Sequence, residues 1–160
     1  MRPFHIPEKP SQVISSRRNP LVRKLRSLAT REGRELFSLV LLEGTHLLQE
    51  ALRTSSFPRG IVATDCWLYE NAELSNSLPK KTFIQKVTSD VLKAALSTVN
   101  PDGVATLWPL DWLPKQVEPS SFVLALDRLQ DPGNLGTLFR TALAADIDAL
   151  WLGSGADPLN

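Results

Sequence analysis

Short apolar stretches alternate with helical patterns along most of the chain, and this alternation constrains the fold more than any other feature. Each stretch has the length of a buried strand, and the segments between them carry apolar residues at helical spacing. We expect strands in FSLVLLEG, GIVAT, TFIQKV, GVATLW, FVLALDRL and ALWLG. Helices are expected from Asn19, from Thr45 as an N-cap, and over residues 89–96. The pattern predicts an α/β protein.

The first predicted helix opens with Asn19-Pro20, a favoured N-cap followed by proline at the first helical position. Leu21, Leu25 and Leu28 follow at helical spacing and predict an apolar stripe. Basic residues precede this stripe or lie on the other faces of the helix, namely Arg17, Arg18, Arg23, Lys24 and Arg26. The sequence therefore predicts a helix with a buried stripe and a basic outer surface.

Positive charge is concentrated near the N-terminus although the net charge is only +1. Residues 1–34 carry nine Lys or Arg and two Glu, a balance of +7, whereas residues 35–160 carry nine basic and fifteen acidic residues, a balance of −6. A basic segment favours nucleic acid because each neutralised phosphate releases counterions. The alternative is a solvent-exposed basic face without a partner.

Other sequence features exclude several classes of protein. No apolar run approaches the ~20 residues that span a bilayer, and MRPFHIPEKP at the N-terminus lacks the apolar core of a signal peptide. We therefore expect a cytoplasmic protein without a membrane partner. The lone Cys66 allows no internal disulfide and is expected to be a buried thiol, and two scattered histidines predict no metal centre.

Proline-rich residues 109–121, PLDWLPKQVEPSS, interrupt the alternation and predict an extended linker. Trp112 and Leu113 are expected to hold this linker against a domain surface. The sequence then predicts one domain over residues 1–108 and a second segment over residues 122–160.

The second segment is expected to form strand, helix and strand, a βαβ unit with parallel strands and a right-handed crossover. Its helix carries an expected apolar face of Leu135, Leu138, Phe139, Ala142 and Leu143. Sheets of this type bind ligands outside the carboxyl ends of their strands, where residues 131–136 and 153–160 are expected to meet.

The helix is preceded by a loop with several special residues, in DPGNLGTLFRTA at 131–142. Pro132 and Gly133 are expected to shape a turn, and Gly136 is expected to let a ligand or a neighbouring element approach closely. Asn134 is either an ordinary N-cap, which its position alone favours, or a polar group aimed at a substrate. The spacing GNLG departs from G-x-G-x-x-G, so it predicts a dinucleotide site only weakly.

Arg140 follows Thr137 by one turn, and its side chain is expected to lean toward the helix N-terminus. A cation in that position is favourable when a bound phosphate is shared with the helix dipole. The alternative is a surface ion pair with Asp127, Asp131 or another carboxylate.

The segment LALDRLQDPGNLGTLFRTALAADIDALWL resembles the first motif of the SpoU (TrmH-type) RNA 2'-O-ribose methyltransferases, in the knotted SPOUT superfamily. The upstream segments SSRRNPLVRKLRSL, LVLLEGTHLLQEAL and NPDGVATL resemble the N-terminal substrate-binding domain of these enzymes. That domain is similar to a small RNA-binding ribosomal protein, which implies an α/β/α arrangement. By this likeness Asn134 and Arg140 match the motif asparagine and arginine, which are associated with catalysis and RNA positioning.

The resemblance implies an enzyme that transfers a methyl group from S-adenosylmethionine to a ribose 2'-hydroxyl of ribosomal or transfer RNA, as a homodimer. The chain stops at Asn160, before the two motifs that form the knot and bind the methyl donor in related enzymes. We therefore expect the N-terminal portion of a longer enzyme, inactive alone, in which no donor-binding residue can be assigned. A non-catalytic RNA-binding module and a small nucleotide-binding α/β enzyme are the alternative readings.

Overall fold

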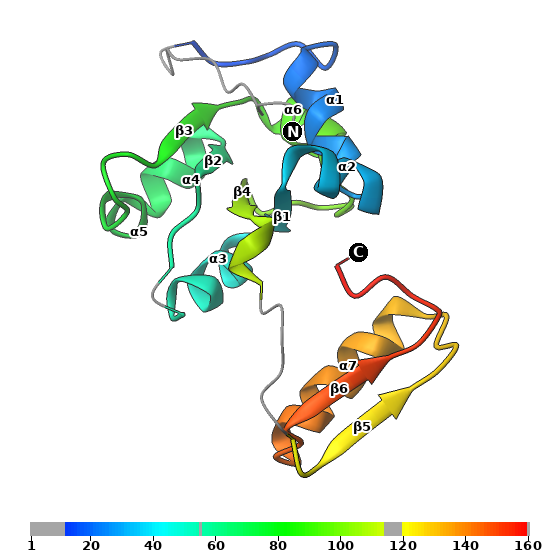
Figure 1. Cartoon of the computed structure of the whole chain (residues 1–160). Coiled ribbons are helices and arrows are strands. Elements are labelled where there is room, and N and C mark those ends of the chain that lie inside the picture. Colours follow the sequence, from blue (N-terminus) through cyan, green and yellow to red (C-terminus); the bar gives the residue numbers. More distant parts are fainter. Residues whose placement is uncertain (1–11, 55, 114–119, 160) are drawn as a thin grey trace. The chain divides into compact units, whose positions relative to one another are not determined.

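The computed structural model describes residues 12–54, 56–113 and 120–159, and the chain divides into two compact units (Figure 1). The first unit comprises residues 1–113 and the second comprises residues 114–160. The first unit extends beyond the predicted limit at residue 108, because residues 110–112 form a short 3-10 helix after the last strand. Residues 114–119 of the predicted linker lie outside the described residues.

Trp112 holds this end of the first unit in place, as the sequence predicted for the start of the linker. Its indole Nε1 donates a hydrogen bond to Thr54 Oγ1 over 3.3 Å. Its ring centroid lies 4.7 Å from that of Trp108, in a tilted aromatic pair.

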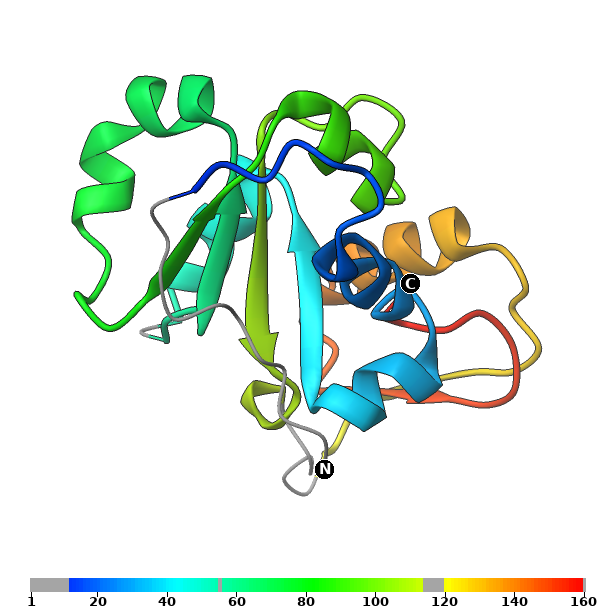
Figure 2. The ribbon, with the colours of Figure 1, turned by 90° about the horizontal axis from the view of Figure 1, so that it is seen from above.

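A four-stranded mixed sheet organises the first unit, in the order β1-β4-β2-β3. Its strands are β1 (Leu39–Glu43), β2 (Gly60–Ala63), β3 (Phe83–Lys86) and β4 (Val104–Pro109). β4 is antiparallel to both β1 and β2, whereas β2 and β3 are parallel. Figure 2 shows the four strands side by side in this order. All four lie where the sequence predicted strands.

Six α-helices of the described residues belong to this unit: α1 (Pro20–Ser27), α2 (Arg31–Phe37), α3 (Thr45–Leu52), α4 (Asp65–Glu70), α5 (Ala72–Asn76) and α6 (Ser89–Ala95). α1, α3 and α6 were predicted. α2, α4 and α5 were missed because helices of seven, six and five residues are too short to show helical periodicity.

The sheet is covered on both faces, because successive strand residues point to opposite sides. α1 and α6 pack on one face through a buried cluster that includes Leu21, Leu25, Leu39, Val62, Leu92 and Leu107. α3 and α4 pack on the other face through a second cluster that includes Val40, Leu48, Ile61, Trp67, Val104 and Trp108. This is the α/β/α arrangement that the resemblance implied.

Asn19 and Thr45 were predicted as the N-caps of the helices that are now α1 and α3. The side chain of Asn19 accepts a hydrogen bond from the Leu21 amide at 2.9 Å, and Pro20 is the first helical residue, so this prediction is confirmed. Thr45 does not cap α3, because it is already the first helical residue after Gly44. The Thr45 amide instead donates to Asp102 Oδ2 at 2.7 Å, an acceptor from the loop before β4.

The second unit is a βαβ unit built from β5 (Val123–Leu126), α7 (Pro132–Ala144) and β6 (Ala149–Leu152). β5 and β6 are paired in parallel, as predicted. Leu135 and Ala142 of the predicted apolar face are buried, but Leu143 is 82% exposed, so its assignment to the packed face was wrong. Leu143 follows Leu135 by eight residues, which places it about 80° around the helix axis from the buried side.

Two further predictions concern single residues and the membrane. Cys66 is exposed on α4, so the expectation of a buried thiol was wrong. A search of residues 12–54, 56–113 and 120–159 finds no helix with the length and apolar character that crossing a bilayer requires.

Candidate functional site

The loop singled out in the sequence forms the first turns of α7. Asp131 is the N-cap, and its Oδ1 accepts a hydrogen bond from the Asn134 amide at 2.6 Å. Pro132 occupies the first helical position rather than a preceding turn, which its fixed φ and missing N–H favour. The cap interpretation of Asn134 was therefore wrong, because Asn134 is the third residue of the helix. Its side chain is exposed and makes no hydrogen bond within the described residues.

Arg140 leans back along α7 toward the helix N-terminus, as its position predicted. Its Nη2 donates to Thr137 Oγ1 at 3.3 Å, and the Thr137 hydroxyl donates in turn to the Gly133 carbonyl at 3.0 Å. A Cβ placed on Gly136 would lie 3.8 Å from Arg140 Nη1, so the group that approaches Gly136 is the guanidinium of Arg140. Thr137 therefore orients a cation that has two further nitrogens able to donate.

The carboxylates considered as partners of Arg140 are occupied by other groups. Asp127 pairs with Arg128 at 3.1 Å, and Asp131 caps α7. Arg140 forms no ion pair with any described residue, so the predicted alternative of a pair with Asp127 or Asp131 was wrong. An exposed guanidinium without a carboxylate partner is available to bind an anion such as a phosphate.

Asn134 and Arg140 do not contact each other directly. They are six residues apart on one helix, which separates their Cα atoms by about 9 Å along the axis and about 120° around it. Thr137 lies between them and draws the arginine head toward Asn134. Sequence analysis missed this role of Thr137, although its i, i+3 spacing from both residues was a signal for it.

The loop after β6 lies against the segment after β5 at the carboxyl ends of these strands. Of the predicted residues 131–136, Leu135 lines a cavity with residues 153–156, whereas the hydrogen bonds between the two loops come from Leu126 and Leu129. The Gly153 amide donates to the Leu126 carbonyl at 2.7 Å, and the Ala156 amide donates to the Leu129 carbonyl at 2.6 Å. Gly155 has a φ of +149°, and a Cβ there would lie 2.3 Å from the Leu129 carbonyl oxygen, so only glycine fits. The cavity between these loops measures about 10 Å³, which is room for about one water molecule.

The predicted RNA-binding residues lie on and just before α1, whose apolar stripe is buried. Arg18, Arg23 and Arg26 are exposed, and their guanidinium groups form no ion pair with a described residue. Arg17 pairs with Asp90 of α6 at 3.3 Å, and Lys24 is half-buried. Four of the five predicted residues therefore have exposed guanidinium groups on or just before α1, and Arg18, Arg23 and Arg26 are the three without an ion pair to a described residue.

One residue of the basic N-terminal region has a structural role that the charge count could not reveal. Arg34 is 2% exposed, and its Nη1 donates to the carbonyls of Leu28 and Ala29 at 3.2 and 3.1 Å. These carbonyls follow α1, where a helix end leaves unpaired acceptors. Arg34 thus joins α2 to the end of α1. The described residues contain no group of three or more His, Cys, Asp or Glu that would hold a metal ion.

Two relatives of this chain are named as RNA methyltransferases. A tRNA/rRNA methyltransferase of Synechocystis is 42% identical over 142 residues, which cover 87% of this chain and 52% of that protein. The 23S rRNA (guanosine(2553)-2'-O)-methyltransferase of Bacillus subtilis is 32% identical, over 92% of this chain and 57% of that protein. The chain thus spans about half the length of the curated relatives it matches.

Solved structures and a domain family agree with these relatives. An S-adenosylmethionine-bound rRNA methyltransferase from Sinorhizobium meliloti superposes with a TM-score of 0.71 at 26% identity, over 92% of this chain and 57% of that one. An RNA 2'-O ribose methyltransferase superposes with a TM-score of 0.73 at 26% identity, over 92% and 58%. The MRM3-like substrate binding domain family matches residues 19–106. This chain therefore belongs to the MRM3-like substrate-binding domain family, and the relatives and structures that it matches here are RNA methyltransferases by name.

Proposed function

We propose that the chain supplies the RNA-binding domain and the first catalytic segment of an enzyme that methylates ribose 2'-hydroxyls of RNA. One observation carries this proposal: the alignment with the 2'-O-methyltransferase of Bacillus subtilis covers 92% of the chain and therefore both units. A relative that shared only an RNA-binding domain would match the first unit alone.

Arg140 is proposed to bind the phosphate next to the ribose that is methylated. Arginine is a poor base because its guanidinium stays protonated near neutral pH, so its contribution is positioning and charge rather than proton removal. The exposed amide of Asn134, one turn before Thr137, is proposed to hold the ribose or the loop. Together these groups would fix the 2'-hydroxyl, and such orientation is a major source of rate in transfer reactions.

The methyl donor is proposed to be S-adenosylmethionine, because a structural neighbour binds it. The cavity at the carboxyl ends of β5 and β6 measures only about 10 Å³, which is too small for a molecule of that size.

RNA is proposed to bind along the exposed side of α1, through Arg17, Arg18, Arg23, Lys24 and Arg26. These cations would contact mainly phosphates, which orient a nucleic acid without reading its sequence. Contacts that recognise the RNA sequence would then be made by another surface of the same domain. The whole enzyme is also proposed to be a homodimer, which sedimentation of the whole protein at two concentrations would test.

The proposal is tested with Arg140→Ala and Arg140→Lys in the whole protein, by transfer of labelled methyl groups to ribosomal RNA. We expect transfer to fall to background for Arg140→Ala and to recover only in part for Arg140→Lys, because lysine cannot make a two-pronged contact with a phosphate. Arg53→Ala is the matched control, since Arg53 is exposed and paired with Glu50 in the first unit. Near-normal transfer by Arg140→Ala with an intact fold would refute the role.

The same assay separates the catalytic proposal from the non-catalytic alternative. If the unchanged whole protein binds RNA but transfers no methyl group, the chain belongs to an RNA-binding module and the catalytic proposal fails. If methyl transfer occurs and depends on Arg140, the module alternative is excluded.

A further inference from the structure

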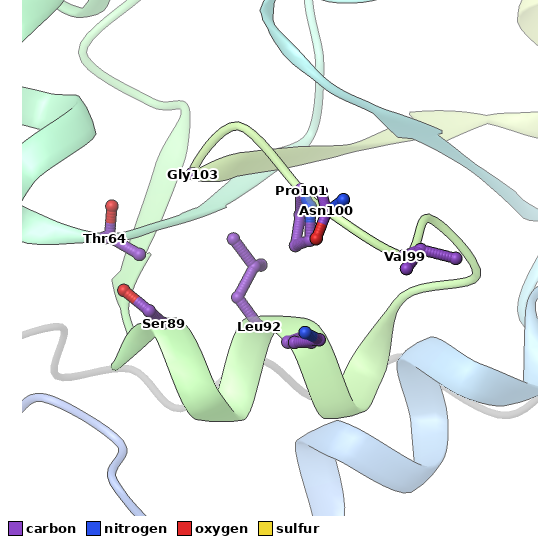
Figure 3. Close-up of a pocket in the computed structure, with 8 residues that line it drawn as sticks. Thr64, Ser89, Leu92, Val99, Asn100, Pro101 and Gly103 are labelled. Atoms are coloured by element: carbon purple, nitrogen blue, oxygen red, sulfur yellow. The ribbon is translucent and has the colours of Figure 1, made fainter.

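A cavity of about 200 Å³ opens at the carboxyl end of β2 in the first unit (Figure 3). Its walls come from Thr64 after β2, the first turns of α6, and residues 99–101 and 103 of the loop before β4. Leu92, Val99 and Pro101 supply apolar surface, and Figure 3 shows the Leu92 side chain rising from α6 toward that loop. Pockets for drug-sized ligands begin at about 300 Å³, so this cavity suits a single small ring system.

Polar groups without partners line the same cavity. The side chains of Ser89, Lys93 and Asn100 are exposed and form no hydrogen bond or ion pair within the described residues. Asn100 offers both donors and an acceptor, and Lys93 offers a positive charge. Apolar walls with a few free polar groups are the usual composition of a ligand site.

Charge at the rim of the cavity favours an anionic ligand. Asp90, next to Ser89, is paired with Arg17 at 3.3 Å. Asp65, next to Thr64, is paired with Lys86 Nζ at 2.7 Å. Both carboxylates are therefore paired with cations. The carboxylates of Glu43 and Asp102 accept hydrogen bonds from amides and hydroxyls and do not line the cavity, so Lys93 is the charged residue of the lining. The pair with Asp90 also places Arg17, part of the basic surface of α1, at this rim.

Side chains of neighbouring elements fix the loop that closes the cavity. The Glu43 carboxylate accepts hydrogen bonds from the amides and hydroxyls of both Ser97 and Thr98, at 2.6–3.0 Å. Asp102 at the other end of the loop accepts from the Thr45 amide at 2.7 Å. The cavity thus has a preformed wall, which lowers the ordering cost of binding.

We propose that this cavity binds one unpaired nucleobase of the RNA substrate, with Asn100 contacting the edge of the base and Lys93 the adjacent phosphate. The inference rests on the proposed function and adds the kind of nucleotide that the first unit recognises. Sequence-specific RNA recognition commonly targets bases that are splayed out of loops or bulges, because their edges are then accessible. A fully paired RNA duplex exposes no unpaired base, so a bulged or looped nucleotide is the expected ligand.

The probe is an RNA hairpin with a single bulged 2-aminopurine, compared with the same hairpin fully paired, using the complete 160-residue chain. We expect quenching of the bulged fluorophore on binding and at least ten-fold tighter binding of the bulged hairpin than of the paired one. Ser89→Phe, which fills the cavity from an exposed position, and the double variant Lys93→Ala with Asn100→Ala should both abolish this preference. Lys81→Ala is the matched charge control, since Lys81 is exposed before the opposite end of β3.

The outcomes separate failure of the pocket from failure of the proposed function. Equal binding of both hairpins, or a preference that survives Ser89→Phe and the double variant, would overturn the pocket while RNA binding by the chain remained. Absence of binding to either hairpin, even at low salt, would contradict RNA binding by the first unit and the pocket together. Circular dichroism of each variant shows whether a loss of preference comes from unfolding.

Discussion

The Arg140 guanidinium donates to the Thr137 hydroxyl over 3.3 Å, and the same hydroxyl donates to the Gly133 carbonyl one turn earlier. Two consecutive hydrogen bonds thus direct a cation toward the start of α7. The cation lies beside Gly136, where a Cβ would be 3.8 Å from Arg140 Nη1, an ordinary van der Waals contact. We interpret Thr137 as a positioning residue for Arg140.

Thr137→Val should lower the rate constant for the proposed methyl transfer by the whole protein about ten- to hundred-fold, because one hydrogen bond to a charged group contributes about 1.5–3 kcal/mol. The Michaelis constant for RNA should change less, since the arginine itself remains. Thr137→Ser keeps the hydroxyl and should restore the rate. Thr141→Val is the matched control, because Thr141 also bonds back to the preceding turn, at 3.0 Å, but does not contact Arg140. Equal rates for Thr137→Val and Thr141→Val would exclude the positioning role.

Asp102→Ala should destabilise the first unit by about 1 kcal/mol, a typical cost of removing a helix cap. Its carboxylate accepts from the first amide of α3 at 2.7 Å, although the two residues are 57 positions apart in the sequence. Urea unfolding followed by tryptophan fluorescence measures the change. Asp111→Ala, at an exposed carboxylate without a described partner, is the control. Destabilisation of the same size in both variants would contradict a capping role.

Thr45 and Asp102 also show where sequence reasoning succeeds and where it stops. The order of strands and long helices followed from apolar spacing, and Asn19 was recognised as a cap because its partner amide is two residues away. The cap of α3 comes from a loop 57 residues later, which no local pattern reveals. Arg34 contributed to the positive charge counted over residues 1–34, but the fold buries it against the end of α1.

In the candidate site, residue identities could be predicted but their partners could not. The resemblance pointed to Asn134 and Arg140, whereas their local roles depended on where α7 begins. Asp131 and Asn134 are both good N-caps by type, and proline at position 132 decides in favour of Asp131. The cavity lined by Lys93 and Asn100 had no sequence signal, because its walls join after folding.

Glu43→Gln should destabilise the protein in a pH-dependent manner. Burial alone raises the pKa of Glu43, but four hydrogen bonds from Ser97 and Thr98 outweigh burial and hold the pKa below its ordinary value. The ionised carboxylate therefore stabilises the fold fully above the pKa of an unfolded glutamate, and this contribution is lost as the pH falls through the lowered folded pKa. The difference in unfolding free energy between the native protein and Glu43→Gln should thus shrink from about pH 6 to about pH 3. A difference that does not change with pH would contradict this linkage.

Glu70→Gln should make Cys66 react faster with iodoacetamide. Cys66 Sγ lies 3.3 Å from Glu70 Oε1, and the hydrogen bond to this carboxylate, with its negative charge, raises the pKa of the thiol. The thiolate is the reactive form, so a raised pKa slows alkylation near neutral pH. Mass spectrometry over time measures the rate for an exposed single thiol. Glu73→Gln, a nearby exposed glutamate, serves as control, and equal rates for both variants would refute the effect of Glu70.

Replacing Arg23 and Arg26 together by alanine should weaken RNA binding and reduce its dependence on salt. Both guanidinium groups are exposed and unpaired among the described residues, and they lie one turn apart on the side of α1 opposite its buried stripe. Each lost phosphate contact should reduce the slope of log affinity against log salt concentration by about 1, so we expect a decrease of about 2. The double variant Arg31→Ala with Arg53→Ala is the matched control, because these exposed arginines are paired with Glu35 and Glu50. An unchanged slope for the Arg23 and Arg26 variant, with the fold intact, would place the RNA on another surface of the first unit.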